Sequence, residues 1–174
     1  YTTLFRSLFT QSKNGKKFYQ LYELIISENN ILLAYRTIKA NKGSSTPGTD
    51  SFTIDNYKEM NQAEFIHLIL SQLENYKPKS IKRVMIPKPN GEKRPLGIPC
   101  MIDRIIQQMF KQVLEPICEA KFYEHSYGFR PLRSAKHALG RIMYLINISK
   151  MHYAVDIDIK GFFDNVNHRL LIKQ

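Results

Sequence analysis

The sequence predicts an α+β fold that is mostly helical, with one β-hairpin and one later strand. Apolar residues recur at helical spacing in several separate segments, as in amphipathic helices that pack on a core. Residues 80–88 and 93–98 alternate on either side of a Pro-Asn-Gly turn, which is typical of a hairpin. Residues 153–159 alternate between apolar residues and small or acidic ones, which favours a buried strand. With 174 residues, 43% of them apolar, the chain is long enough to bury a core.

The charge balance favours a polyanionic partner. The chain has 26 Lys and Arg residues against 15 Asp and Glu, a net charge of +11 and an isoelectric point near 9.6. Because the sequence has no apolar run of about 18 residues, nucleic acid is preferred over a membrane. Cys100 and Cys118 have apolar neighbours and are too few for a disulfide scaffold. We therefore expect free thiols in a reducing compartment such as the cytoplasm. The five histidines show no zinc-type pairing.

Residues 1–60 are predicted to form a helical, basic extension. Residues 18–26 and a helix that starts near Asn30 carry apolar residues at helical spacing, and residues 41–50 form a loop rich in Gly, Pro and Ser. A short helix over 53–60 follows. The basic residues of this extension fit two interpretations, solvated helix faces or contacts with nucleic-acid phosphates. They are Lys13, Lys16, Lys17, Arg36, Lys39 and Lys42.

Residues 77–94 are the most basic stretch, with seven cations against the single acid Glu92. A helix over 63–76 precedes this stretch, which includes the predicted hairpin. Its cations, Lys82 and Arg83 among them, either clamp phosphates or protect an exposed strand edge from aggregation.

Two further helices follow the hairpin. The first starts at about Met101, carries paired apolar residues on one face, and is expected to give way to a new turn at Pro116. A loop over 126–134 contains Arg130 and Arg133, which either bind phosphate or brace the loop. Ser134 is the expected N-cap of the second helix, residues 135–148.

The stretch over 153–168 places two Asp residues near the end of the last predicted strand. Asp156 and Asp158 share one face of that strand, and Gly161 then breaks the alternation. Carboxylates in such a position suit Mg²⁺, which is held by one or two carboxylates together with substrate phosphates. The alternative is an edge strand with solvated acids. The helix that begins near His168 is preceded by residues with capping side chains, Asp164, Asn165 and Asn167.

Four segments together resemble the reverse transcriptases encoded by group II introns. They are Asn41-Lys-Gly with Pro47-Gly-Thr-Asp50; Ile86-Pro-Lys-Pro-Asn-Gly-Glu-Lys-Arg-Pro-Leu-Gly-Ile-Pro99 leading into Asp103-Arg-Ile-Ile-Gln-Gln108; Ser126-Tyr-Gly-Phe-Arg-Pro131; and Asp158-Ile-Lys-Gly-Phe-Phe-Asp164. The resemblance implies a right-hand polymerase fold. Residues 1–60 would be the N-terminal extension with a template-contacting loop, 61–150 the fingers and the fingers/palm helices, and 151–174 the start of the palm.

The resemblance also implies roles for individual residues. Asp158 is the expected catalytic residue and binds Mg²⁺ in a two-metal site, with the carbonyl of Ile159 as a further ligand; Asp156 is left as a structural acid. The resemblance implies that the other matched residues bind the incoming nucleotide. Lys88 and Arg94 grip the triphosphate, the backbone of Gly161 and Phe162 supports it, and Phe163 stacks below the sugar and excludes a 2′-hydroxyl.

Two departures from the family pattern lie in loops. Thr49 and Ser51 stand where the family has Ile and Gly, and Leu132 stands where a glycine often follows Phe-Arg-Pro. A third is larger, because the 174 residues contain no Tyr-x-Asp-Asp segment. The chain begins at Tyr1 and stops inside an amphipathic segment, so we expect a piece of a longer protein that is inactive by itself.

Two functions of different class are implied. The longer protein would synthesise DNA on an RNA template from a DNA primer and deoxynucleotide triphosphates. Alternatively, this segment is a non-catalytic maturase module that binds its intron RNA and assists splicing, a task for the basic N-terminal helices. Uncovered strand edges and apolar surface at the unfinished palm further predict a homodimer of the chain.

Overall fold

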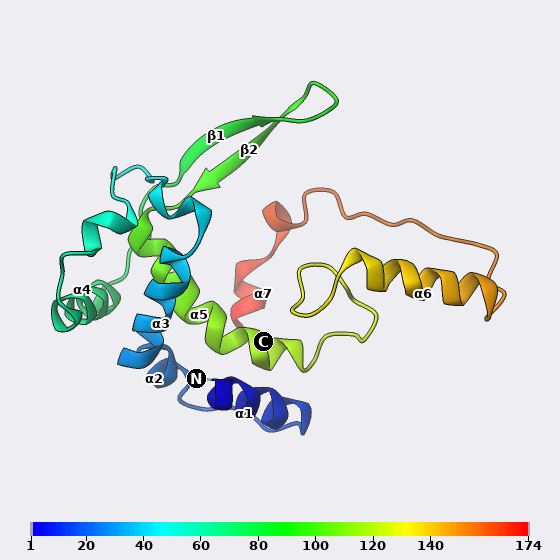
Figure 1. The fold of residues 1–174 in the computed structure, drawn as a ribbon, viewed down its shortest axis with the longest axis horizontal. Coiled ribbons are helices and arrows are strands. Elements are labelled where there is room, and N and C mark those ends of the chain that lie inside the picture. Colours follow the sequence, from blue (N-terminus) through cyan, green and yellow to red (C-terminus); the bar gives the residue numbers. More distant parts are fainter. Residues whose placement is uncertain (1, 174) are drawn as a thin grey trace. The chain divides into compact units, whose positions relative to one another are not determined.

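The computed structural model describes residues 2–173, without the side chains of Thr2 and Asp164. The chain divides into an N-terminal unit that ends at Tyr123 and a C-terminal unit that begins at Glu124. The N-terminal unit contains α1 (Thr2–Lys13), α2 (Leu21–Ile25), α3 (Glu28–Lys39), α4 (Gln62–Glu74), β1 (Lys82–Pro87), β2 (Lys93–Ile98) and α5 (Met101–Glu119), with 3₁₀ turns at Lys42–Ser45 and Ile54–Tyr57 (Figure 1). The C-terminal unit contains α6 (Ala135–Asn147), a 3₁₀ turn at Phe163–Asn165 and α7 (His168–Lys173).

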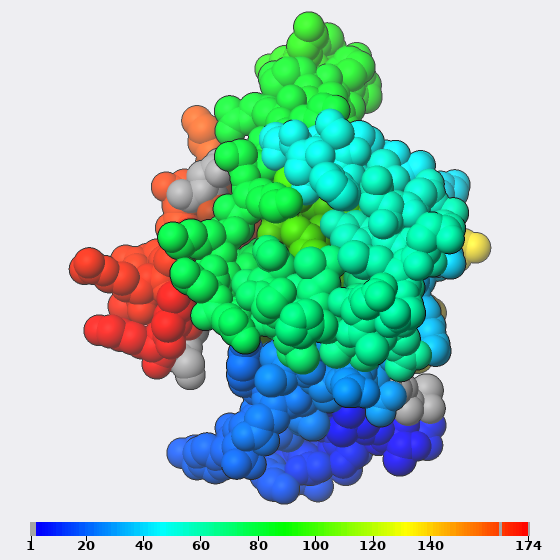
Figure 2. Space-filling model, turned by 90° about the vertical axis from the view of Figure 1, so that its left-hand side faces the viewer, coloured from blue at the N-terminus to red at the C-terminus, as the bar shows by residue number. Residues whose placement is uncertain are grey.

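Helix α5 is the centre of the N-terminal unit. Its predicted apolar stripe is confirmed, since Met101, Ile105, Met109 and Val113 are completely buried. Helices α1, α2 and α3 pack against it. In Figure 2, α5 (yellow-green) shows only at the bottom of a hollow between the segments that cover it. Burial of this stripe, at roughly 1.5–3 kcal/mol per large apolar side chain, is what holds the unit together.

Buried polar contacts set how α3 and α1 lie on α5. Asn30 Nδ2 donates to the carbonyls of Ile25 (2.8 Å) and Met109 (3.1 Å), and Gln112 Nε2 donates to the carbonyl of Asn30 at 2.7 Å. Ser12 Oγ of α1 donates to the carbonyl of Ile117 at 2.8 Å. Each of these buried polar groups is paired, so the contacts specify register at little cost.

The new turn predicted at Pro116 is wrong. Helix α5 continues through Pro116 to Glu119. Proline removes one backbone donor, at a cost of about 3 kcal/mol in a helix interior, but Pro116 lies in the last turn, where α1 packs against the same helix. Packing along the helix outweighs the one missing hydrogen bond.

Other N-terminal predictions hold in part. Helix α3 begins at Glu28 and α4 at Gln62, where Asn61 and Glu64 form a reciprocal cap. The helix predicted over 18–26 is shortened to α2, because Gln20 has a left-handed backbone (φ 62°). The helix predicted over 53–60 is only a 3₁₀ turn. Helix α1 was not predicted.

The predicted hairpin is confirmed. β1 and β2 are antiparallel, with Val84 opposite Leu96. The backbone N–H of Gly91 donates to the carbonyl of Lys88 at 3.0 Å, and only Gly91 of the Pro-Asn-Gly turn has a positive φ, 83°. A turn followed by a left-handed glycine is a common three-residue hairpin connection. In Figure 1 the hairpin extends away from the helices of its own unit.

The strand predicted over 153–159 is wrong. These residues have no regular secondary structure, and Val155, Ile157 and Ile159 are 83%, 82% and 66% exposed. Alternation supplies side chains for a sheet, but a strand also needs a neighbour for its backbone N–H and C=O groups. No other segment that the structure describes pairs with it.

The two helix caps predicted for the C-terminal unit have different outcomes. Helix α6 begins after Ser134 as predicted, although the Ser134 hydroxyl lies 3.3 Å from His137 Nδ1 and does not cap the backbone. The cap of α7 is confirmed in Asn167, whose Oδ1 accepts from the N–H of Leu170 at 3.2 Å. The Asp164 side chain lies outside the described residues. Among the helices that the structure describes, none has the length and apolar character to cross a bilayer.

Candidate functional site

The hairpin sorts its basic residues onto two faces. By register, Arg94 pairs with Ile86 and Lys82 pairs with Ile98, so both cations share a face with the apolar pair of Val84 and Leu96. Arg83 and Lys93 belong to the opposite face. All four cations are exposed. Basic residues therefore line both sides of a ribbon with apolar side chains between them.

Lys88 lies at the hairpin tip and is paired with Glu92. Its Nζ is 2.8 Å from Glu92 Oε2, and its backbone N–H donates to the Glu92 carbonyl at 2.6 Å. The Lys88 ammonium lowers the pKa of the exposed Glu92 carboxyl. Lys88 is thus positioned by an acid that any anionic ligand of this lysine must displace.

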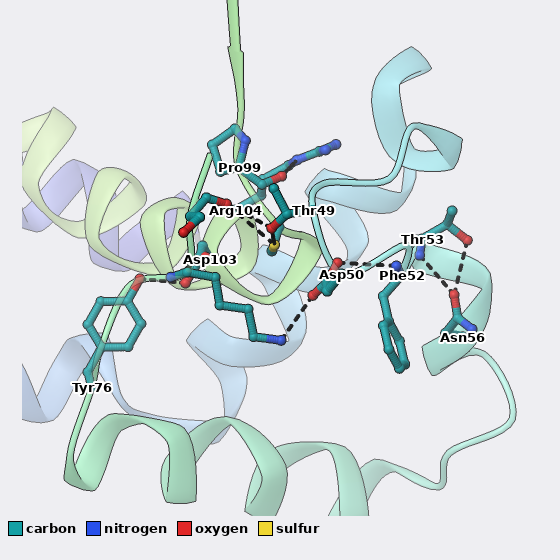
Figure 3. Close-up of polar contacts among 12 residues, drawn as sticks. Thr49, Asp50, Phe52, Thr53, Asn56, Tyr76, Pro99, Asp103 and Arg104 are labelled. Atoms are coloured by element: carbon teal, nitrogen blue, oxygen red, sulfur yellow. Dashed lines mark hydrogen bonds and ion pairs between the residues drawn. The ribbon is translucent and has the colours of Figure 1, made fainter. Parts of the chain in front are cut away.

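Arg104 ties the base of the hairpin to the loop over 41–50. Its Nε donates to the carbonyl of Pro99 at 2.8 Å, while its terminal nitrogens donate to the carbonyls of Gly43 (2.9 Å) and Thr46 (2.7 Å). Figure 3 shows Arg104 between the hairpin base and the loop. Three carbonyls on one guanidinium fork fix the loop against the start of α5.

Gly48 and Thr49 make another close approach between the loop over 41–50 and the base of the hairpin. Thr49 Oγ1 donates to the carbonyl of Ser80 at 2.9 Å and lies 3.3 Å from Cys100 Sγ. A Cβ on the buried Gly48 would lie 2.7 Å from Cys100 Cα and 2.8 Å from Cys100 N. Only glycine fits here, because the neighbours are backbone atoms that cannot move aside.

Asp103, in the first turn of α5, anchors the segment that leads into the hairpin. It is 2% exposed and accepts from the Tyr76 hydroxyl at 2.7 Å and from the Lys79 N–H at 3.2 Å (Figure 3). Burial, and then Asp103, raises the pKa of Tyr76 to about 12. A carboxylate in the first turn of a helix is also favoured by the helix dipole. This anchor holds the two ends of the hairpin together.

Lys79 pairs with Asp50 at 3.0 Å and joins the loop over 41–50 to the same segment. Burial raises the pKa of Asp50, but hydrogen bonds from Lys79 and from the Phe52 N–H outweigh it, so the pKa lies below its ordinary value. The Asp50 bond raises the pKa of Lys79. Together with Gly48, Asp103 and Arg104, this pair forms a supporting frame under the hairpin.

The roles of the frame residues were missed from sequence. Asp103 and Arg104 begin one of the four family segments, and Gly48 and Asp50 lie in another, but no contact between those segments was assigned. The available signal was the presence of charged residues at the start of an otherwise apolar helix.

The acidic stretch of the C-terminal unit is exposed. Asp156 and Asp158 lie in the extended segment before Gly161, whose φ is 62°. Asn165 Nδ2 donates to the Gly161 carbonyl at 2.8 Å and closes a tight turn. Phe162 and Phe163 follow, 53% and 87% exposed, with ring centroids 5.4 Å apart in an edge-to-face arrangement. The carboxylate of Asp158 therefore lies just before this turn, and the rings of Phe162 and Phe163 lie directly after Gly161.

Asp158 has oxygen donors suited to a hard cation. Its exposed carboxylate has no hydrogen bond or ion pair to another described residue, and the Ile159 carbonyl follows it directly. Among the described residues, no group of three His, Cys, Asp or Glu is arranged to hold a metal ion. A carboxylate and a neighbouring carbonyl are the kind of oxygen ligands used by Mg²⁺, which keeps several water or phosphate ligands.

The basic residues of the N-terminal extension are exposed. Lys13 ends α1, and Lys16 and Lys17 follow in an irregular segment. Arg36 and Lys39 lie in the last turn of α3, with Lys39 Nζ 5.7 Å from the Tyr35 ring centroid; Lys42 begins the next 3₁₀ turn.

The two arginines of the loop over 126–134 contact that loop. Arg130 donates to the carbonyl of Ser126 at 2.9 Å, and Arg133 donates to the carbonyl of Glu124. Arg133 also lies over the Tyr127 ring, 5.6 Å from its centroid. These contacts brace the loop, and they leave phosphate binding by the two arginines as a prediction.

Comparison with known proteins agrees with these features. Residues 86–174, about half of the chain, match the family described as reverse transcriptase (RNA-dependent DNA polymerase). The chain is 37% identical over 169 residues to the group II intron-encoded protein LtrA of Lactococcus lactis subsp. cremoris, covering 92% of this chain and 27% of LtrA. It is 36% identical over 162 residues to the protein YkfC of Escherichia coli, covering 88% of this chain and 42% of YkfC.

A fungal relative extends the same pattern. The putative COX1/OXI3 intron 1 protein of Saccharomyces cerevisiae is 32% identical over 146 residues, covering 83% of this chain and 17% of that protein. The chain therefore spans less than half the length of each of these relatives. It belongs to the reverse transcriptase family and is a segment of the type of reverse transcriptase and maturase that group II introns encode.

Proposed function

We propose that a longer protein carrying this chain is an RNA-directed DNA polymerase that uses two Mg²⁺ ions. The observation that carries the proposal is the family match over residues 86–174, which includes the exposed Asp158 carboxylate and the Gly161 turn after it. Bound Mg²⁺ would activate the primer 3′-hydroxyl and neutralise the leaving pyrophosphate. Asp158 and the Ile159 carbonyl would hold it from this chain.

Each remaining residue has a task in the same reaction. Lys88 and Arg94 bind the triphosphate, where developing charge is stabilised by fixed cations. The backbone of Gly161 and Phe162 supports it, and the Phe163 ring packs under the sugar and excludes ribonucleotides. In this proposal the fold is a right-hand polymerase, with residues 1–60 as extension, 61–150 as fingers and 151–174 as the start of the palm.

The 174 residues alone are proposed to be inactive, because they lack a Tyr-x-Asp-Asp segment for the remaining carboxylates. The test is DNA primer extension on an RNA template by the longer protein, with Mg²⁺ and with EDTA, beside the 174-residue chain. Metal-dependent extension by the longer protein alone supports the proposal. Extension by the chain alone, or none by the longer protein with Mg²⁺, contradicts it.

A second function rests on a separate observation, the exposed cations of the N-terminal unit. We propose that Lys13, Lys16, Lys17, Arg36, Lys39 and Lys42, with Lys82 and Arg83 of the hairpin and Arg130 of the C-terminal unit, bind intron RNA and thereby assist splicing. The free thiols of Cys100 and Cys118 suit the reducing compartment in which such an RNA would be met.

Replacing Lys13, Lys16 and Lys17 together by alanine should weaken RNA binding and flatten its salt dependence. For every phosphate that the variant no longer binds, the slope of log K against log salt should fall by about 0.7–1 unit. Fluorescence anisotropy between low and high salt measures the slope. Replacing Lys58, which pairs with Asp55, is the matched control. An unchanged slope would mean that the three lysines are solvated and do not contact RNA phosphates.

Replacing Glu92 by glutamine should release Lys88 for the triphosphate. Removing the competing carboxylate should lower the KM for deoxynucleotide triphosphate by about two- to five-fold, the range of an exposed ion pair. Steady-state primer extension by the longer protein measures this KM. Glu59→Gln makes the same charge change away from the hairpin. A KM that rises, or that falls equally in the control, would argue against Lys88 as a triphosphate ligand.

The isolated chain should self-associate through its C-terminal unit, as a homodimer. Leu139, Ile142, Met143 and Ile146 of α6 are all more than half exposed, beside an exposed apolar segment after the helix. Apolar patches of this kind drive association. Light scattering should show a mass that rises with concentration and falls in Ile142→Asp. A concentration-independent monomer mass would refute the proposal.

A further inference from the structure

A pocket of about 610 Å³ opens on the N-terminal unit, and none of its lining residues is among those assigned above to metal, nucleotide or RNA binding. It lies between α2, the end of α4 with the turn after it, and α5. Aromatic and apolar side chains form its walls, chiefly Tyr22, Tyr76, Phe110 and Pro78, while Gln107 and Lys111 add polar ends. Its size and its few polar groups are those of ligand pockets in general.

One wall is held rigid from behind. The Tyr76 hydroxyl is committed to the buried Asp103 at 2.7 Å, and the raised pKa of Tyr76, about 12, keeps that hydroxyl protonated. Tyr76 is nevertheless 37% exposed. Tyr76 therefore offers a neutral, immobile aromatic surface, which costs little conformational entropy to engage.

The part of the wall formed by Tyr22 is also held by a buried contact. Tyr22 is 50% exposed on α2, and the last turn of α2 is tied down by the hydrogen bond from Asn30 to the Ile25 carbonyl. Five-residue helices are not stable alone, so this buried contact and the packing of α2 on α5 hold the helix that carries Tyr22.

The polar ends lie one helical turn apart on α5. Gln107 is exposed, and its amide can both donate to and accept from the edge of a planar ligand. Lys111 is exposed and pairs with Glu115 only at 3.7 Å, a contact that is easily exchanged for another anion. Ring faces, an amide and a cation thus lie in one pocket.

A nucleotide presents the complementary set, namely a flat apolar face, a hydrogen-bonding edge and a phosphate. Lysines flank both tyrosine walls, at Lys17 before α2 and at Lys77 after Tyr76. Acids also occur there, Glu23 and Glu74 among them, so local charge does not attract phosphate by itself. The net charge of +11 supplies the long-range attraction to a polyanion.

We propose that this pocket binds one unstacked base of single-stranded RNA, with the base against Tyr22 and Tyr76 and its phosphate on Lys111. The proposal deepens the RNA-binding function proposed above and rests on it. Single-stranded RNA is recognised through splayed bases that stack on aromatic side chains, whereas bases in a duplex remain paired and inaccessible.

The test uses the 174-residue chain and two labelled probes, a uridine oligonucleotide of about 10 nucleotides and an RNA duplex of about 16 base pairs. Tyr22→Ala should weaken oligonucleotide binding about five-fold or more and leave duplex binding within two-fold, while Tyr22→Phe retains affinity. Tyr19→Ala is the matched control, because Tyr19 is 80% exposed in the same segment and does not line the pocket. Lys111→Ala should lower the salt slope, and Tyr22→Ala should not.

A second experiment uses only the unaltered chain, so its result does not depend on whether a variant folds. An oligonucleotide with 5-iodouridine, irradiated with the unaltered chain, should crosslink to the peptide that contains Tyr22 or Tyr76. Three results would overturn the proposal that this pocket binds an RNA base. They are equal losses of affinity in Tyr22→Ala and Tyr19→Ala, equal losses for the oligonucleotide and the duplex, and crosslinks only to other peptides. The pocket would then be a candidate site for a protein partner instead. Absence of any salt-dependent RNA binding by the unaltered chain would instead overturn the proposed RNA-binding function.

Discussion

Replacing Asp158 by asparagine in the longer protein should reduce RNA-templated DNA synthesis by about a thousandfold or more. A metal-bound carboxylate contributes several kcal/mol to transition-state stabilisation, and each 1.36 kcal/mol is tenfold in rate. Asparagine keeps the size of the side chain and removes its charge. Because Asp158 is exposed and makes no hydrogen bond to a described residue, the substitution should not affect folding. Single-turnover primer extension with saturating Mg²⁺ measures the rate.

The matched control for this prediction is Asp156→Asn. Asp156 is equally exposed, two residues earlier in the same extended segment. Residues two apart on an extended chain are roughly 6.5–7 Å apart, so both need not bind one ion. Asp156→Asn should therefore keep its rate within a few-fold. RNA binding and assistance of splicing should survive both changes. Equal losses in the two variants, or more than a tenth of the rate remaining in Asp158→Asn, would remove Asp158 from the metal site.

Replacing Gly48 by alanine should destabilise the N-terminal unit by about 2–4 kcal/mol, at or above the usual range for overpacking. The new Cβ would lie 2.7 Å from Cys100 Cα and 2.8 Å from Cys100 N. Relief requires the loop to move away from the hairpin base, which also strains the contacts of Thr49 and Arg104. Urea denaturation of the 174-residue chain, followed by circular dichroism, measures the free energy of unfolding.

Gly43→Ala controls for the general effect of replacing glycine in this loop. A Cβ at Gly43 would meet nothing within 4 Å, and the residue lies in the same loop, five positions earlier. It should be neutral or slightly stabilising, because alanine loses less backbone entropy on folding. If the two variants unfold at the same urea concentration, then the close approach at Gly48 does not determine the stability of this unit.

Sequence reasoning worked best where local chemistry is sufficient. The Pro-Asn-Gly turn needs only a left-handed Gly91, and the apolar stripe of α5 needs only helical spacing, so both were predicted. Asn167 was identified as a cap because its side chain bonds a backbone N–H three residues away. Pro116 failed because the local rule for proline ignores the packing of α1 on the same helix.

The failure at residues 153–159 has a different origin. Alternation of Val155, Ile157 and Ile159 is a real property of the sequence, but a strand exists only when another strand completes its hydrogen bonds. The apolar residues of this segment are exposed, and no described strand pairs with it. The alternating pattern therefore needs a second strand before it can form a sheet.

The amino-acid sequence by itself determined the family, the basic character of the chain, the hairpin and the main helices, since these depend on residue order, charge and short-range periodicity. The tertiary structure alone decided how the family segments meet, with Arg104 on the carbonyls of Gly43 and Thr46, Asp103 under Tyr76, and Gly48 against Cys100. Those contacts join residues dozens of positions apart, and a hydrogen bond or a close approach depends on distances in space that no sequence pattern specifies.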